Sequence, residues 1–586
     1  MRASYLHLQR NVLFLAAVIL LAVAGISHAT PLPLNAECGP VGEFVISRAK
    51  LIATQGYSLC FEGTPANFNS SSTTGPWTWQ CLGNNGGESR SCSTSLSPAP
   101  ACGGAHGSGF STAPSSDLCS GGQPLLVTGR GPWGWICGNV FSGTSVLCGA
   151  ASTAPTPAAR SWDFTNSIGV NAHLGSTNTH YGNLGQTIAD LHFLQSIHGS
   201  SHIGFNHMRT SVMSYHFAKL LAKSNITALV SPTQAGLQDP AANQAMFDQF
   251  AYVIEGIEGV NEPDHIFTTP NGLFSSGFVY NNQTGVLAAV VYQRDLYNFL
   301  KSDPVTSTIP VYNFSLGYLN DADISGDMSA YADIANIHAY AGKGSSPYLS
   351  IIPHVAQQVN MPGKPAVISE IGYPSIPPGE SINLKSPNYN KLMNEVSEDV
   401  QAKYTLSELF DSFIAGYTKI FVYELYDDGG PEPNSCDVAN TNKEFHFGLF
   451  RCDWSPKPLA MALKNLVSIL ADPSVEAATF TPQSLAFTLT QTSSDPNQNV
   501  NVFNTLLQNS AGTYFLALWA EPVLWNVTTA QQIPVAGPNI VTVTLNEAKN
   551  FKVYDPMVGP APISQLLGAT QVVVDVYDHP IIIALN

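Results

Sequence analysis

Charged residues are scarce in this sequence, where 24 lysines and arginines and 41 aspartates and glutamates make up only 11% of 586 residues. The formal net charge is -17, and no basic stripe is present that could neutralise phosphates, which argues against a nucleic-acid-binding role. A hydrophobic fraction of 44% is typical of a globular protein. The chain is too long for one ordinary core, so we expect two or more domains.

Long apolar runs are missing beyond the N-terminus. Residues 1–29 are predicted to be an export signal, in which Arg2 and Arg10 supply positive charge and the stretch NVLFLAAVILLAVAGI is apolar. Ser27-His28-Ala29 then offers small residues at the positions that a signal peptidase reads. A membrane anchor is the alternative for this segment. We expect a secreted, periplasmic or cell-surface protein with no membrane span after signal cleavage.

Metal-binding motifs are also absent, because the sequence holds neither close C-x-x-C pairs nor H-E-x-x-H. We therefore predict no metal and no cofactor. The 10 cysteines are even in number and follow an export signal, so they indicate disulfides. Cys436 and Cys452 lie just after the last predicted barrel strand, where a bridge would hold a long loop.

A repeat occupies the region before the barrel. Residues 36–95 and 96–150 each hold four cysteines, with the related cores GPWTWQCLGNNGG and GPWGWICGN. They resemble Cys/Trp modules appended to exported proteins, and each is expected to be stapled by two disulfides of unknown pairing. The paired tryptophans share one face of a strand, where we favour a core role over stacking on sugars. Residues 151–161, rich in Ala, Pro and Thr, are expected to be a linker.

Strand-like and helical segments alternate over residues 162–472, and this pattern predicts a (β/α)8 TIM barrel. A doubly wound sheet competes with it, but no Gly-rich phosphate loop follows the first strand. Short apolar runs between turn residues predict an antiparallel β-sandwich over 473–586. The eight predicted barrel strands are SIGVNAH (167–173), HMRTSV (207–212), ITALVS (226–231), EGIEGVN (255–261), IPVYNFS (309–315), IANIHAY (334–340), PAVISEIG (365–372) and KIFVYELY (419–426).

Two glutamates end predicted strands on opposite sides of this barrel. Asn261-Glu262-Pro263 closes the fourth strand, and Ser369-Glu370 lies near the end of the seventh. Active sites of such barrels gather at the carboxyl ends of the strands, so the two side chains are expected to face each other. A pair of carboxyl groups about 5 Å apart is the apparatus of a retaining glycosidase.

With these residues the chain resembles glycoside hydrolase clan A, and its barrel followed by a sandwich is similar to families 39, 30, 79 and 5. The resemblance implies that Glu262 is the general acid/base and Glu370 the nucleophile. It implies that Asn261 binds the sugar 2-hydroxyl and that Arg209 holds the nucleophile ionised and oriented. It also implies a hydrogen bond from Tyr340 to the nucleophile. His338 accompanies Tyr340 on the sixth strand, where a satisfied core histidine is an equal alternative.

The first and eighth strands are expected to complete the glycone end of the cleft. Asn171 and His173 end the first strand, and Tyr423 and Glu424 end the eighth. Clan members commonly have a tryptophan platform on the eighth strand, whereas this chain has FVYELYDD. This departure leaves the sugar undefined.

The sequence therefore predicts an exported retaining glycoside hydrolase that cleaves β-linked oligo- or polysaccharides by double displacement. A transglycosylase with the same covalent intermediate is one alternative. A non-catalytic carbohydrate-binding surface protein on a degenerate barrel is another, although a pure binder needs no opposed acid and nucleophile.

Overall fold

A computed structural model of the chain describes most of its residues. The chain splits into two compact units, one of residues 1–100 with 138–145 and the other of residues 101–137 with 146–586. The described residues are 37–38, 60–62, 64–69, 77–83, 87–94, 100–128, 131–138, 145–174, 179–211, 213–233, 235–264, 266–268, 274–276, 278–317, 325–348, 361–376, 395–427, 446–493 and 502–586.

The predicted barrel is confirmed, and each predicted strand overlaps an observed one. Eight parallel strands pair in the order β24-β19-β18-β17-β14-β29-β26-β25. A bridge between Tyr312 and Ile334 joins the two ends of this sheet. The strands are β14 (Ile168–Asn171), β17 (His207–Thr210), β18 (Thr227–Val230), β19 (Ile254–Glu258), β24 (Val311–Tyr312), β25 (Ala335–His338), β26 (Ala366–Ile371) and β29 (Ile420–Val422).

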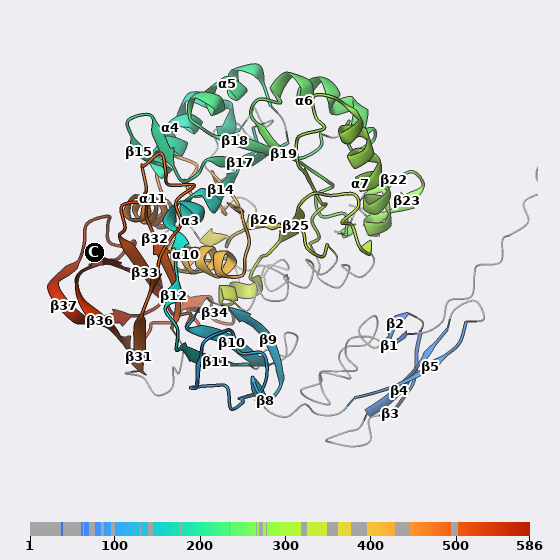
Figure 1. Cartoon of the computed structure of the whole chain (residues 1–586). Coiled ribbons are helices and arrows are strands. Elements are labelled where there is room, and N and C mark those ends of the chain that lie inside the picture. The colour runs from blue at the N-terminus through green and yellow to red at the C-terminus, as the bar shows by residue number, and fades with distance from the viewer. Residues whose placement is uncertain are drawn as a thin grey trace, which may run out of the picture. The chain divides into compact units, whose positions relative to one another are not determined.

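Helices surround this sheet because each presents one apolar stripe to it. Figure 1 shows α4 to α7 following one another around the outside of the strands. Side chains from helices and strands form one large buried core. The helices are α3 (Ser161–Ser167), α4 (Leu184–Leu194), α5 (Tyr215–Lys223), α6 (Gln244–Phe250), α7 (Gly285–Ser302), α10 (Glu398–Ile414) and α11 (Pro458–Leu470).

The C-terminal region forms the expected antiparallel sheet structure. The long strand β36 (Asn539–Tyr554) pairs with β31 (Phe487–Ser493), β37 (Ser564–Val576) and β38 (Ile581–Leu585). Its alternating buried and less buried residues fit a sheet with one face inward. The sheet continues through β33 (Tyr514–Trp519) and β32 (Phe503–Gln508).

The segment expected to be a linker carries two short strands. β12 (Thr156–Pro157) pairs with β30 (Ser484–Leu485), and β13 (Ala159–Arg160) runs parallel to β32. The chain therefore passes along the C-terminal sheet before α3 leads into the barrel.

Short strand pairs also occur outside the main sheets, formed by β15 (Ser196–His198) with β16 (Ser201–Ile203), β20 (Ile266–Thr268) with β21 (Phe274–Ser276), β22 (Val279–Tyr280) with β23 (Gln283–Thr284), β27 (Ser375–Ile376) with β28 (Val396–Ser397), and β34 (Trp525–Asn526) with β35 (Gln531–Gln532).

Disulfides staple both Cys/Trp modules. In the first, Cys60 bonds Cys81 beside the sheet of β3 (Thr64–Asn69), β4 (Trp77–Leu82) and β5 (Arg90–Thr94). A short pair, β1 (Glu37–Cys38) with β2 (Cys60–Glu62), belongs to the same unit. Cys92 is also disulfide-bonded.

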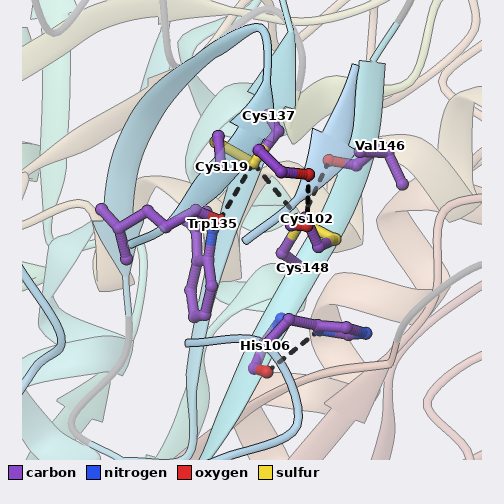
Figure 2. The surroundings of a disulfide bond; sticks show 10 residues. Cys102, His106, Cys119, Trp135, Cys137, Val146 and Cys148 are labelled. Carbon is purple, nitrogen blue, oxygen red and sulfur yellow. Dashed lines mark hydrogen bonds between the residues drawn. A yellow bond between two sulfur atoms is a disulfide. The ribbon is translucent and has the colours of Figure 1, made fainter. Parts of the chain in front are cut away.

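The second module has two bridges, Cys102–Cys148 and Cys119–Cys137, which Figure 2 shows around Trp135. The Trp135 indole N–H donates to the Leu118 carbonyl at 2.8 Å. The module comprises β6 (Ala101–Cys102) paired with β8 (Cys119–Gly121), and a sheet of β7 (Gly109–Phe110), β11 (Ser145–Ser152), β10 (Trp133–Gly138) and β9 (Gln123–Thr128).

The paired tryptophans of both modules are core residues, as the sequence favoured. Trp77 and Trp135 are 0% exposed, Trp79 is 1% and Trp133 is 6% exposed. Their faces are therefore closed to sugar rings.

Two sequence expectations fall wholly or partly outside the described residues. The export signal at 1–29 is one of them, and the Cys436 partner of a bridge to Cys452 is the other, although Cys452 itself is disulfide-bonded. Within the described part of the chain, no helix has the length and apolar character needed to span a bilayer.

Aromatic rings and carboxyl groups join the barrel to the C-terminal sheet. Phe410 of α10 stacks on Trp519 of β33 with ring centroids 5.2 Å apart. Beside them, Glu408 and Asp411 of α10 are fully buried, and Glu521 is nearly so. Both Glu408 carboxyl oxygens lack a hydrogen-bond partner among the described residues. Burial and the neighbouring Glu521 raise the pKa of the Glu408 carboxyl well above its ordinary value.

We expect Glu408→Gln to stabilise the protein at pH 8 and to change little at pH 4. A carboxyl with a raised folded-state pKa contributes its full stability below its unfolded pKa and loses it as pH rises. The gain should grow by about 1.4 kcal/mol per pH unit up to the folded pKa. Urea unfolding at both pH values measures it, with Glu476→Gln at an exposed position as the control. Equal effects of Glu408→Gln at the two pH values would contradict this assignment.

Candidate active site

The carboxyl ends of the barrel strands bring most of the sequence-predicted site residues together. Arg209 lies on β17, His338 ends β25, and Glu370 lies near the end of β26. Glu262 follows β19 by a few residues, and its backbone N–H donates to the Ser315 carbonyl at 3.0 Å. Parallel strands in a closed barrel end at one rim, which is why residues so distant in sequence meet there.

Glu262 has an unusual backbone for a residue with a side chain. Its φ of 42° lies in the left-handed region, which costs a non-glycine residue about 1–3 kcal/mol. Such strain persists only where surrounding bonds hold it, and here Asn261 forms a bridge with Ser315 of the neighbouring strand end. In this conformation Oε1 of Glu262 lies 2.7 Å from Nδ1 of His338.

Arg209 is the buried centre of the site. Its Nε and Nη2 donate to the two carboxylate oxygens of Glu258 at 2.6 and 2.7 Å, a bidentate pair. Its Nη1 donates to Oε1 of Glu370 at 2.5 Å and to Oδ1 of Asn171 at 3.1 Å. Burial opposes the guanidinium charge, but Glu258 and Glu370 more than offset it and raise the pKa of Arg209. The cation is therefore permanent and fixes the Glu370 carboxylate.

Further hydrogen bonds connect Glu370 and Arg209 to neighbouring strand ends. The Tyr340 hydroxyl donates to Oε2 of Glu370 at 2.7 Å. Nη2 of Arg209 also donates to Oδ1 of Asn261 at 2.6 Å, which fixes that amide next to Glu262. Asn171 in turn donates from Nδ2 to the Ser369 carbonyl at 3.0 Å. The orientation of Glu370 thus depends on a network that spans several strands.

The two candidate carboxyl groups meet at His338. Nδ1 of His338 lies 2.7 Å from Oε1 of Glu262 and 3.5 Å from Oε2 of Glu370. The donor atoms of these three residues all lie within 4.8 Å of one another. Burial favours the neutral ring, but Glu370 and Glu262 raise the pKa of His338 above its ordinary value. The imidazole therefore lies between the two carboxyl groups, within hydrogen-bond distance of Glu262.

His173, Tyr423 and Glu424 form an adjoining cluster. Nε2 of His173 lies 3.2 Å from Oε2 of Glu424 and 3.3 Å from the Tyr423 hydroxyl. Burial lowers the pKa of His173, but the Glu424 carboxylate outweighs it, so the pKa is raised. Solvent reaches His173 but not Glu424, because the His173 side chain is 43% exposed whereas that of Glu424 is 1% exposed. The Tyr423 ring lies 6.4 Å from that of Tyr340, which connects the cluster to Glu370.

Sequence reasoning missed two residues of this site. Tyr181 donates from its hydroxyl to Oε2 of Glu424 at 2.8 Å. Phe447 packs edge-on against Tyr423 and Tyr340, with centroids 5.3 and 5.8 Å away. Tyr181 lies in a short 3-10 helix (His180–Gly182) after β14, and Phe447 lies in an irregular segment after β29, so no periodic pattern marks either residue as facing the cleft. Their aromatic type near a strand end was the signal available.

Comparisons with known proteins give remote likenesses. No family model matches the chain, and no curated protein matches its sequence. A family 39 glycoside hydrolase from Bacteroides cellulosilyticus WH2 is 13% identical, covers 83% of this chain and all of its own, and has a TM-score of 0.42. A β-1,3-glucanase and allergen of Cryptomeria japonica pollen is 14% identical over 50% of this chain and 97% of its own, with a TM-score of 0.34.

A putative β-galactosidase from Bacteroides fragilis is 10% identical, with a TM-score of 0.36. The match covers 86% of this chain but only 61% of that protein. The solved structures that this chain resembles thus include several glycoside hydrolases.

Proposed function

We propose that this protein is a retaining O-glycoside hydrolase that cleaves β-linked glycans, with Glu262 as general acid/base and Glu370 as nucleophile. The observation that carries the proposal is the approach of the two carboxyl groups, whose oxygens lie within 4.8 Å of each other and of His338. Retaining enzymes need about 5 Å between the carboxyl groups, whereas inverting enzymes leave roughly 6.5–9.5 Å for a water.

In the first step, Glu370 attacks the anomeric carbon while Glu262 protonates the departing glycosidic oxygen. A covalent glycosyl ester forms on Glu370 and the aglycone leaves as an alcohol. In the second step, Glu262 takes a proton from water as that water attacks the same carbon, and Glu370 leaves as a carboxylate. Two inversions give net retention, and both residues return to their starting states.

The surrounding residues suit these two roles. Arg209 and Tyr340 both donate to Glu370, which keeps a carboxylate oriented for attack. His338 bonds Glu262 and so orients that carboxyl group for proton transfer to and from the substrate. Asn261, held by Arg209, is placed to bind the hydroxyl next to the anomeric carbon, a contact that strengthens in the transition state. The β configuration follows from the resemblance to clan A.

Labelling with a panel of 2-deoxy-2-fluoro glycosides carrying good leaving groups tests this proposal. One member of the panel should inactivate the protein and add its glycosyl mass to the peptide that contains Glu370. The reactive member identifies the glycone, and a label on any other carboxylate would contradict the assignment. Product masses with and without an added sugar acceptor then separate hydrolysis from transglycosylation. A wild-type chain that binds glycans without label or turnover would be a binding protein.

A further inference from the structure

The catalytic carboxyl groups and His338 also form a set of metal-ligand atoms. Imidazole nitrogen and carboxylate oxygen are donors that Zn²⁺ accepts, at about 2.0–2.2 Å. Tetrahedral ligands at that distance lie about 3.4 Å apart. Nδ1 of His338 and Oε2 of Glu370 are already 3.5 Å apart, and Oε1 of Glu262 is 2.7 Å from Nδ1. A small outward rotation of Glu262, whose side chain is 14% exposed, would complete three of four positions.

We propose that Glu262, His338 and Glu370 bind a divalent transition-metal ion such as Zn²⁺, and that this ion reversibly inhibits the protein by occupying the cleft. Where His338 is neutral and Glu262 is ionised, the local charge favours a dication, because the carboxylates of Glu258, Glu262 and Glu370 outnumber the guanidinium of Arg209. Among the described residues, no other group of three or more metal-ligating side chains has donor atoms that converge so closely.

The site is suited to an inhibitor rather than a resident cofactor. Histidines that hold a permanent metal almost always donate their other ring N–H to a carboxylate, carbonyl or water. Nε2 of His338 is buried and finds no such partner among the described residues. The ion must also displace the hydrogen bond between His338 and Glu262. Both features weaken binding, so the metal should exchange freely and compete with substrate.

The inhibition rests on the proposed function, whereas metal binding does not, and the experiment therefore measures both in the full chain. Zn²⁺ should raise the apparent KM without changing kcat, and Mg²⁺, which demands six oxygen-rich positions, should have no such effect at the same concentration. Calorimetric titration with ZnCl₂ should show one site that His338→Gln weakens at least about tenfold. His173→Gln is the matched control, because His173 is nearby but outside the set, and it should bind Zn²⁺ as the wild type does.

The calorimetric and kinetic results test the metal site and the inhibition separately. Unchanged Zn²⁺ affinity in His338→Gln, or equal losses in both variants, would overturn the metal site. A noncompetitive pattern would overturn occupation of the cleft. If no glycoside is turned over but calorimetry still separates the two variants, the proposed function fails and the metal site stands. If glycosides are turned over but Zn²⁺ does not bind, the metal site fails and the proposed function stands.

Discussion

Glu370→Ala is expected to lower kcat by roughly 10⁴-fold, equivalent to about 5 kcal/mol of transition-state stabilisation, because the variant lacks the group that forms the covalent intermediate. Folding should be preserved, since Arg209 keeps its bidentate pair with Glu258. The measurement is steady-state turnover of an activated aryl glycoside, with circular dichroism and unfolding curves to confirm the fold.

Azide distinguishes the two carboxyl roles in the same assay. In Glu370→Ala, azide can enter the vacated space and attack the anomeric carbon directly, which gives an α-glycosyl azide from a β-glycoside. In Glu262→Ala, the covalent intermediate still forms from an activated substrate, and azide attacks it from the acid/base side to give the β-azide. Identical anomers from both variants would contradict the assigned roles.

Arg209→Met is expected to lower the free energy of unfolding by about 3–5 kcal/mol and to abolish turnover. The substitution leaves the carboxyl group of Glu258, which is 0% exposed, without its bidentate partner. It also removes the bond that orients Glu370. Urea unfolding and kcat measure the two effects. Adding Glu258→Gln should recover part of the stability but none of the activity.

Arg294→Met is the matched control for this loss. Arg294 is 47% exposed and pairs with its neighbour Asp295 at 3.2 Å, so its removal should cost less than about 1 kcal/mol. Similar losses in the two variants would show that the Arg209 network adds nothing beyond an ordinary surface ion pair.

The barrel was predictable because its strands are buried on both faces and carry apolar runs. β26, for example, has all six residues buried. The order of the strands also followed from the alternation with helices, since parallel strands need crossover connections. The strand pairing of 156–160 with the C-terminal sheet was not predictable, because segments rich in Ala, Pro and Thr carry no strand periodicity.

The site was predictable where a residue belongs to a strand end. Glu262, Glu370, Arg209, His338 and Tyr340 all lie within one polar network. The strand ends predicted that the two glutamates face each other, whereas the places of Arg209 and Tyr340 beside Glu370 were implied by the resemblance to clan A. The bidentate bond of Arg209 to Glu258 depends on the register between neighbouring strands, which sequence patterns do not specify. Tyr181 and Phe447 come from the connections that follow strands, whose approach to the cleft depends on tertiary packing and not on local pattern.

The stacked aromatic rings between the barrel and the C-terminal sheet have a practical consequence. Phe164 stacks on Phe410 at 4.3 Å, Phe410 on Trp519, and Trp519 on Phe503 at 5.7 Å, so the rings interleave across the joint. A barrel truncated after residue 472 would expose the apolar surfaces of Phe164 and Phe410 to water and would be prone to aggregate. Anyone producing a shortened form for crystallisation or engineering should keep both halves on one polypeptide.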